Sequence, residues 1–204
     1  MKTVERFEGI IIRVDKSKEY DLRVVFLTPY GQRMSYAIGA LKVSAKLKGA
    51  LQLFNLVEVE VIGTRIMSAR VLSNNSMMAG DINKFYLACS ICETVYKLIR
   101  GADEEAFFLT TVALAMLHPD MRNHFSCYLV FIYFYWTLLE ILGYGIEETS
   151  FLQRTLWQIK TPEELDKIKI GLSEAKTTIK MLDKAYVANL DFQIPMVEHF
   201  LGVV

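Results

Sequence analysis

Residues 22–38 read LRVVFLTPYGQRMSYAI, and this stretch decides the fold of the first part of the chain. An apolar run over 22–28 leads into Pro29-Tyr30-Gly31, a typical turn sequence. A second run covers 32–38. Two short runs of this kind on either side of a turn predict a β-hairpin.

Further strands are predicted on both sides of this hairpin. Residues 9–14, GIIIRV, form an apolar run before it. Residues 56–61 alternate strictly, which places Val57, Val59 and Val61 on one face and two glutamates on the other. Gly63-Thr64 then turns the chain into residues 65–72, where alternation puts Met67, Ala69 and Val71 on one face.

The predicted fold class is α+β, with a five-stranded N-terminal barrel followed by helices. Five short strands, with a looped or helical insert over 40–55 before the fourth, are typical of a small Greek-key barrel of the OB type. Closure of the barrel is favoured because an open sheet would leave exposed edges. The polar residues 73–76 mark a boundary, so we expect an OB-fold domain over 1–75 and an α-helical domain over 76–204.

The second part of the chain has helical periodicity. Helices are predicted over 81–100, 103–117 and 125–142, with a new start at 161–164, another helix around 175–186 and a short one over 195–201. Asp81 is the expected N-cap of the first helix and Gly101 its stop. Its expected apolar stripe consists of Ile82, Phe85, Tyr86, Cys89, Cys92, Tyr96 and Ile99.

Residues 125–142, FSCYLVFIYFYWTLLEIL, require a test against a membrane span. A spanning helix needs roughly 20 apolar residues. This run is 18 residues long, contains Glu140 and lacks a flanking cluster of Lys or Arg. We therefore expect a buried helix of a bundle, with a membrane-associated segment as the alternative.

Composition and charge narrow the functional classes. Of the 204 residues, 52% are hydrophobic and 23% charged, which excludes a disordered chain. Residues 1–75 carry 12 Lys+Arg and 7 Asp+Glu, a net +5, whereas residues 76–204 carry 11 and 16, a net −5. This split indicates either a polyanionic partner for the first half or an ordinary scatter of surface charge.

Signatures of enzymes and of metal or cofactor sites are missing from the sequence. It contains no GxxxxGK[ST], GxGxxG or GxSxG motif, so no catalytic residue and no cofactor is expected. Cys89 and Cys92 form a CxxC, but a zinc site would need a second pair and only Cys127 remains. Both cysteines lie on the predicted apolar stripe, which favours a core role. Three cysteines indicate a reducing compartment, and we expect a cytoplasmic protein.

The basic side chains of the first half are the candidate functional residues. Positive side chains at suitable spacing are sufficient to bind phosphates, and tyrosines can add stacking on bases. The tyrosines available are Tyr20, Tyr30 and Tyr36. The predicted DNA-binding residues are Arg13, Arg23, Arg33, Lys42, Lys46 and Lys48. A solubilising loop is the alternative explanation for the three lysines.

These motifs, taken in order, resemble the bacterial recombination mediator RecO family. The resemblance lies in EGIIIRV at 8–14, DLRVVFLTPYGQRMSYAIGALK at 21–42 and AKLKGALQLFNLVEVEV at 45–61. The family has a similar D-R-V-LT-YG hairpin and a similar LxGALQPFNxVExE segment. Residues 142–145, LGYG, also resemble the family's LLGY after a long apolar helix.

The resemblance implies a function in DNA repair and recombination. Members of the family have an OB-fold and a helical domain, bind single- and double-stranded DNA, anneal complementary strands and help to load the RecA recombinase. The implied partners are DNA, RecR and the acidic C-terminal tail of the single-strand-binding protein, and the implied location is the bacterial nucleoid. Many members also carry a four-cysteine zinc module after LLGY. Residues 146–157 contain no cysteine, so no zinc is expected, and the C-terminal part diverges.

Two functional classes therefore remain open. In the first, the basic barrel binds DNA and the chain acts as a mediator without enzymatic activity. In the second, the protein is an interaction module without DNA binding, and its helical half binds a partner's amphipathic tail in an apolar groove.

Overall fold

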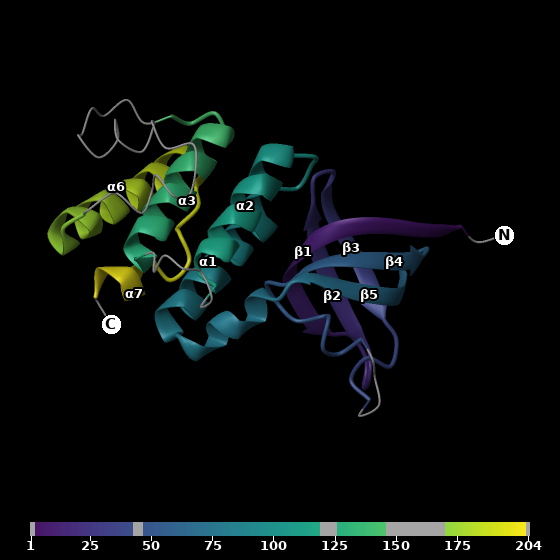
Figure 1. Cartoon of the computed structure of the whole chain (residues 1–204). Coiled ribbons are helices and arrows are strands. Elements are labelled where there is room, and N and C mark those ends of the chain that lie inside the picture. The colour runs from purple at the N-terminus through teal and green to yellow at the C-terminus, as the bar shows by residue number, and fades with distance from the viewer. Residues whose placement is uncertain (1–2, 43–46, 119–125, 146–169, 203–204) are drawn as a thin grey trace.

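The computed structural model describes residues 3–42, 47–118, 126–145 and 170–202 of the chain. It is an α+β structure in which a five-stranded N-terminal sheet is followed by helices (Figure 1). The strands are β1 (Val4–Lys16), β2 (Leu22–Thr28), β3 (Gly31–Ala37), β4 (Leu56–Ile62) and β5 (Arg65–Ser73). The described helical elements are η1 (Asn75–Gly80), α1 (Ile82–Leu98), α2 (Glu104–Met116), α3 (Cys127–Ile141), α6 (Leu172–Leu190) and α7 (Val197–Leu201).

The five strands close on themselves in the order β1-β2-β3-β5-β4. The pairs β1–β2, β1–β4, β2–β3 and β4–β5 are antiparallel. A parallel pairing of Tyr36 with Arg65 joins β3 to β5 and completes the circuit. Strand β1 pairs with two neighbours: its first half pairs with β4 and its second half with β2.

The turn between β2 and β3 forms as the sequence predicts. The Thr28 hydroxyl donates to the Gly31 carbonyl at 2.8 Å and accepts a bond from the Tyr30 amide at 3.2 Å. Gly31 has a φ of +103°, a conformation that favours glycine. A Cβ at Gly31 would also lie 2.9 Å from the backbone of Gly101, so this glycine permits close approach of the hairpin to the loop before α2.

A β-bulge in β1 decides which side chains face the helices. The register shifts between Ile11 and Arg13, so Ile12 is an extra residue on the bulged strand. Ile11 packs inside the barrel, whereas Ile10 and Ile12 belong to the cluster that includes the helices. The bulge therefore gives β1 two apolar contacts with the helical part, followed by the outward-facing Arg13.

The face predicted for the last strand is partly wrong for the same reason. Val57, Val59 and Val61 of β4 are fully buried, as predicted. On β5, however, the buried residue is Ile66, while Met67 is 47% exposed. A register shift between Glu60 and Val61 makes Met67 the unpaired residue of a bulge, which inverts the alternation at this point.

The insert before β4 consists of turns in its described residues, and it closes the barrel interior. Ala40 and Leu51 are buried in the barrel core, and Leu47 packs against it. Phe54 packs instead in the cluster shared with the helices. The insert thus contributes to both apolar clusters.

The helix caps follow the sequence closely. The Asp81 carboxylate accepts bonds from the amides of Asn83 and Lys84 at the start of α1. The Asp103 carboxylate accepts a bond from the Ala106 amide at 2.8 Å at the start of α2. Short acceptors at N-caps satisfy amides that would otherwise lack partners. Helices α6 and α7 also lie where they were predicted, whereas the start predicted at 161–164 falls outside the described residues.

The apolar stripe predicted for α1 is wrong at Ile82 and omits several buried residues, whereas Cys92 and Ile99 are buried as predicted. Ile82 is 62% exposed, whereas Leu87, Ala88, Ile91 and Val95 are fully buried. Helix α1 lies between the barrel and the other helices, and it contacts β1, α2 and α3. A helix enclosed on several sides buries more than one stripe, so periodicity alone does not identify its faces.

Helix α3 is the buried centre of the helical part. Its 15 residues include nine that are buried, among them Phe131, Phe134 and Tyr135. Within the described residues, no helix has both the length and the apolar character required to cross a membrane. The aromatic side chains pack on one another and on α6, with Tyr135 and Tyr186 in edge-to-face contact at 5.6 Å.

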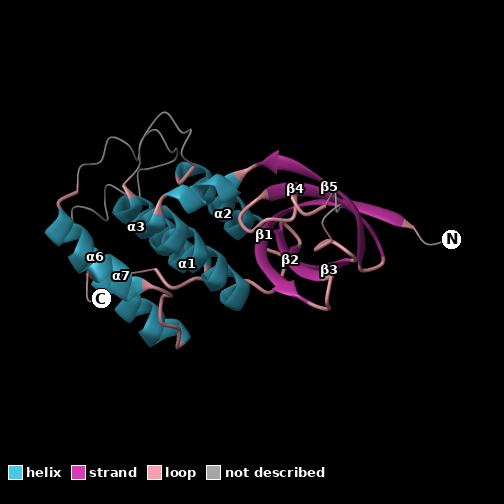
Figure 2. Cartoon of the chain, turned by 90° about the horizontal axis from the view of Figure 1, so that it is seen from below, coloured by secondary structure: helices cyan, strands magenta, loops and turns pink. Residues whose placement is uncertain are grey.

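The barrel and the helices share one apolar cluster. The views in Figures 1 and 2 place α1 and α2 next to the barrel and α6 and α7 on the far side. The outer barrel residues Ile10, Ile12, Val25 and Leu27 are buried in the same cluster as the helices. The division into domains 1–75 and 76–204 stays a prediction, and a continuous core crosses it.

Candidate nucleic-acid interface

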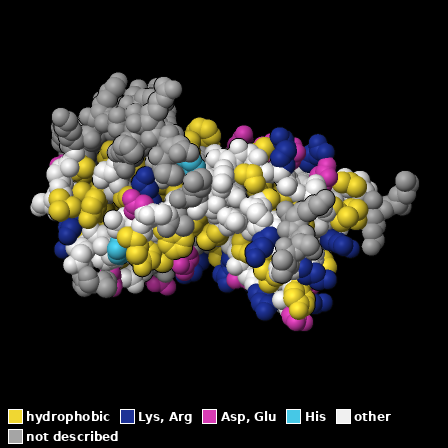
Figure 3. Space-filling model, turned by 60° about the horizontal axis from the view of Figure 1, so that its bottom comes forward, with side chains coloured by type: hydrophobic (Ala, Val, Ile, Leu, Met, Phe, Trp, Pro, Cys, Tyr) yellow, Lys and Arg dark blue, Asp and Glu magenta, His cyan; other side chains and the backbone are white. Residues whose placement is uncertain are grey.

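Lysine and arginine side chains gather over the barrel on the face shown in Figure 3. Several of them are neutralised locally. Arg6 of β1 pairs with Glu60 of β4, and Arg70 of β5 pairs with Glu58 of β4. Within the described residues, Lys16, Lys18, Lys48 and Arg65 have no ion pair. Apart from Arg65 at the start of β5, the described cations of the barrel without an ion pair therefore lie outside strands β4 and β5.

Two of the predicted residues, Arg13 and Arg23, are brought together around Asp15. Their guanidinium groups lie 2.9 and 2.7 Å from the same carboxylate oxygen. Hydrogen bonds from Arg13 and then Arg23 lower the pKa of Asp15. Two cations on one anion leave one net positive charge. Arg13 also stacks on Tyr96 of α1, 4.9 Å from the ring centre, which fixes it at the edge between barrel and helices.

The next residues along this surface are brought together by strand pairing. Arg23 is the cross-strand partner of Tyr36 on β3, and Tyr36 pairs on its other side with Arg65 of β5. The Tyr36 amide also donates to the carbonyl of Thr64 at 2.7 Å. An aromatic ring thus lies between two arginines on three neighbouring strands, and both arginines carry exposed side-chain area.

Tyr20 and Lys42 extend this surface at the end of the barrel. The Leu41 amide donates to the Tyr20 carbonyl at 3.0 Å, and the Gly39 amide donates to the Asp21 carboxylate at 2.7 Å. These bonds hold the β1–β2 loop against the loop after β3. As a result the Lys42 ammonium lies 5.8 Å from the centre of the Tyr20 ring, which is 45% exposed. We refer to Tyr20, Arg23, Tyr36, Lys42 and Arg65 as the Tyr36 strip.

Arg33, another predicted DNA-binding residue, lies apart from this strip. It pairs across the strands with Phe26, whose side chain is inside the barrel, so it occupies the opposite face of β3 from Tyr36. Its guanidinium makes two bonds to the Glu5 carboxylate, at 2.8 and 2.7 Å, and stacks 4.3 Å from the Phe7 ring. Hydrogen bonding to Arg33 lowers the pKa of Glu5. This arrangement is that of a structural ion pair.

Lys46 and Lys48 are the remaining predicted DNA-binding lysines. Lys48 is exposed in the turn before the buried Ala50, and no described contact joins it to the Tyr36 strip. Lys46 lies outside the described residues.

The sequence indicates residues of the Tyr36 strip, but it does not indicate which of them are neighbours. Tyr36 stood among three possible stacking tyrosines, and Arg65 among the basic residues of the barrel half. The alternation of β3 places Tyr36 outside the barrel together with Gln32 and Met34. The neighbourhood of Arg65, by contrast, depends on the pairing of β3 with β5, which are far apart in the sequence.

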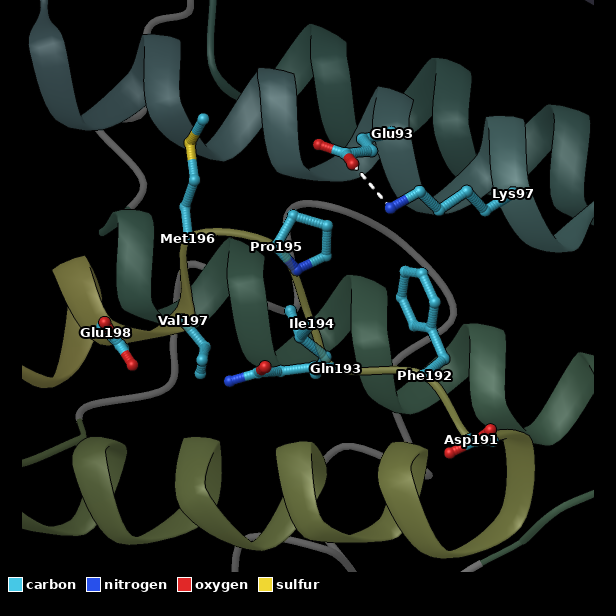
Figure 4. A pocket seen from close by; sticks show the side chains of 10 residues that line it. All are labelled: Glu93, Lys97, Asp191, Phe192, Gln193, Ile194, Pro195, Met196, Val197 and Glu198. Carbon is cyan, nitrogen blue, oxygen red and sulfur yellow. Dashed lines mark ion pairs between the residues drawn. The ribbon is translucent and has the colours of Figure 1, made fainter.

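A groove in the helical half lies between α1 and the segment that follows α6 (Figure 4). It has a volume of about 610 Å³ and is lined by Lys97 and by three acids, Glu93, Asp191 and Glu198. The Lys97 ammonium is paired with Glu93 at 2.7 Å. The lining is therefore acidic, which does not favour the acidic protein tail that the family resemblance implies as a partner.

The cysteines lie in or against the apolar core, as the helical pattern predicts. Cys92 is buried in the shared cluster, and Cys89 packs against it. Burial raises the pKa of the Cys92 thiol and raises that of Cys127 to about 11. Such thiols are poor nucleophiles and poor metal ligands at neutral pH. Among the described residues, no group of three or more His, Cys, Asp or Glu side chains could hold a metal ion.

No protein-family model matches the sequence, and no curated protein matches it significantly.

Proposed function

We propose that the protein binds nucleic acid strands through the Tyr36 strip and acts as a non-enzymatic mediator of DNA recombination and repair. The observation that carries the proposal is the position of Tyr36 between Arg23 and Arg65 on three adjacent strands. Single-strand-binding surfaces combine a cationic track for the backbone with aromatic rings for the bases. Arg23, Tyr36 and Arg65, which are neighbours on three paired strands, supply both components.

We further propose that the barrel is an OB-fold. In that fold the outer face of strands 2 and 3, with the loops joining strands 1–2 and 4–5, binds oligonucleotides. Four of the five residues of the Tyr36 strip come from these places or border them: Tyr20 lies in the β1–β2 loop, Arg23 and Tyr36 lie on β2 and β3, and Arg65 is the first residue of β5, next to the β4–β5 loop. Lys42 lies in the insert between β3 and β4. The strand order β1-β2-β3-β5-β4 supports the same proposal.

Strand annealing would follow from charge neutralisation. Cations that contact phosphates reduce the repulsion between complementary strands, while the base edges remain free to pair. Part of the β2–β3 face is covered by the helices, since Val25 and Leu27 are buried there. The open part is therefore a short track, which supports contacts with a few nucleotides of each strand. The motifs shared with the RecO family support annealing and recombinase loading, with RecR and the single-strand-binding protein as partners.

The dependence of binding on salt tests this proposal. Fluorescence anisotropy with a labelled single-stranded oligonucleotide is measured at several salt concentrations between about 50 and 200 mM. We expect affinity to fall steeply with salt. The double variant Lys42→Gln/Arg65→Gln should bind more weakly, and its slope of log K against log salt should be smaller by about 0.7 for each lost phosphate contact.

The matched control is Lys180→Gln/Lys184→Gln, which removes two exposed lysines from α6 on the far side of the molecule. This variant should keep the affinity and slope of the unmodified protein. Salt-independent binding, or equal losses in the two double variants, would exclude the Tyr36 strip as the binding surface. An annealing assay with complementary strands then separates a mediator from a passive binding protein.

A protein-interaction module without DNA binding is the second candidate, and the groove between α1 and residues 191–198 favours it. Its floor includes Ile194 and Val197, both buried, and its rim carries the exposed Met196. Amphipathic segments dock with their apolar side in such grooves, and the polar side of a segment bound here would meet Glu93, Asp191 and Glu198. Absence of DNA binding by the unmodified protein at low salt would favour this candidate over the first.

A further inference from the structure

A second groove lies between α2 and α3, on the part of the helical body where α2 begins and α3 ends. It has a volume of about 420 Å³. Two residue rows line it. On α2 the row consists of Glu104, Glu105, Phe108 and Leu109, and on α3 it consists of Tyr133, Thr137 and Ile141. Both rows follow the spacing of four residues that places side chains on one helix face, so the groove is built from two regular helix surfaces.

One large apolar side chain of this groove is strongly exposed. Leu109 is buried and forms part of the floor. Phe108, its neighbour, is 67% exposed, although the rest of α2 is largely packed against α3 and the barrel. No described aromatic or cationic group stacks on the Phe108 ring. Contiguous exposed apolar surface is typical of interaction sites, and Phe108 lines this groove together with Leu109, Tyr133 and Ile141.

The rim of the groove is acidic. Glu104 and Glu105 occupy the first turn of α2, where the helix dipole favours negative charge. Neither forms an ion pair with a described residue. The chain from residue 76 onward also carries a net charge of −5, from 11 Lys+Arg and 16 Asp+Glu. The side chains of a partner that covers Phe108 would lie next to the carboxylates of Glu104 and Glu105, which have no described ion pair.

We propose that this groove binds a segment of a partner protein that presents a large apolar side chain flanked by lysine or arginine. The apolar side chain would cover Phe108 and Leu109 between the two helices. The flanking cations would pair with Glu104 and Glu105, which supplies electrostatic complementarity. A nucleic acid strand or an acidic tail does not fit, because its charge would be repelled by the same carboxylates. The site is separate from the Tyr36 strip and does not depend on it.

Three synthetic peptides of equal length test the proposal. Each is labelled with fluorescein and has a central leucine-phenylalanine-leucine, flanked by lysines in the first, serines in the second and glutamates in the third. Anisotropy with the full-length protein should give the strongest binding for the lysine peptide and the weakest for the glutamate peptide. Phe108→Ser should weaken the affinity for the lysine peptide roughly tenfold, the usual effect of removing one interface hot spot. The double variant Glu104→Gln/Glu105→Gln should remove the preference for lysine over serine.

The matched control is Leu172→Ser, which removes an apolar side chain that is 57% exposed at the start of α6. This variant should bind the lysine peptide as the unmodified protein does. Equal binding of the three peptides, or of none, would overturn the proposal. So would a dimer that dissociates in Phe108→Ser, since a second copy would then be the occupant. A large loss of unfolding stability in Phe108→Ser without peptide binding would assign the groove to the chain's own packing.

Discussion

Tyr36 is the residue whose surroundings differ most from those of the other barrel tyrosines. Its cross-strand neighbours on the two sides are both arginines, whereas Tyr30 lies at the tip of the β2–β3 turn with 86% of its surface exposed. Stacking on a base needs a ring held in place beside a phosphate contact. Tyr36 meets this requirement and Tyr30 does not.

The substitution Tyr36→Leu should therefore weaken binding of single-stranded DNA by about 1–3 kcal/mol, the usual value for one stacked base. The salt slope should be unchanged, because no charge is removed. Anisotropy titrations with a labelled oligonucleotide measure both quantities. Tyr30→Leu is the matched control and should bind like the unmodified protein. A similar loss in both variants would mean that Tyr36 has no special role.

The ion pairs show how far individual cations can be judged from a sequence. Arg13, Arg23 and Arg33 were predicted as phosphate ligands because they are basic residues in a basic segment. In the structure each has a carboxylate within 2.9 Å. For Arg13 and Arg23 the carboxylate, Asp15, is close in sequence or strand register. For Arg33 it is Glu5, which the closure of the barrel brings near. The pairing of the strands must be known to distinguish arginines with a carboxylate partner from cations without one.

At the scale of elements, the hairpin β2–β3 caps the end of α1. The amide nitrogen of the Gln32 side chain donates to the carbonyls of Val95, Tyr96 and Ile99, at 3.2, 2.9 and 2.6 Å. The Val95 carbonyl also accepts from the Ile99 amide. The carbonyls of Tyr96 and Ile99 are at the end of the helix, where carbonyls have no partner within the helix and need an external donor if water is excluded. The Asp103 amide donates to the Pro29 carbonyl at 3.1 Å, which fixes the start of α2 to the same turn.

Gln32→Met should consequently destabilise the protein by about 1–3 kcal/mol, since it leaves part-buried carbonyls without a donor while keeping a side chain of similar length. Urea unfolding followed by circular dichroism measures the change. Gln52→Met is the control, because Gln52 is exposed and its side chain makes no described hydrogen bond. An equal, small effect in both variants would show that the barrel and α1 are joined by apolar packing alone.

The elements themselves were largely predictable, and the exceptions have a common cause. Turn residues and N-cap acids act locally, so Pro29-Tyr30-Gly31 and Asp81 indicated their roles from the sequence. The bulges at Ile12 and Met67 could not be predicted, because an inserted residue becomes visible only when the partner strand is known. The buried faces of α1 likewise depend on neighbours from both halves of the chain. The groove between α2 and α3 was missed because no local pattern marks Phe108 as exposed.

At the scale of the whole molecule, one apolar core joins two parts of opposite charge. The barrel supplies the cationic strip, and the helical part supplies two grooves with acidic linings. Because Arg13 stacks on Tyr96 and Gln32 caps α1, the two parts are held in a fixed relation. A strand bound at the barrel and a basic partner segment bound at α2–α3 would then occupy separate surfaces of one body.

The shared core predicts that a fragment of residues 1–75 is unstable by itself. Without the helices, Ile10, Ile12, Val25 and Leu27 would be exposed on the barrel's outer wall. Burial of each such side chain contributes about 1.5–3 kcal/mol, so the loss is about 6–12 kcal/mol in total. This equals most of the 5–15 kcal/mol that stabilises a typical domain. The fragment should therefore show no cooperative thermal transition by circular dichroism, whereas the full-length chain shows one. A cooperative transition at the midpoint of the full-length protein would mean that the barrel is an independent domain and that the helices only rest against it.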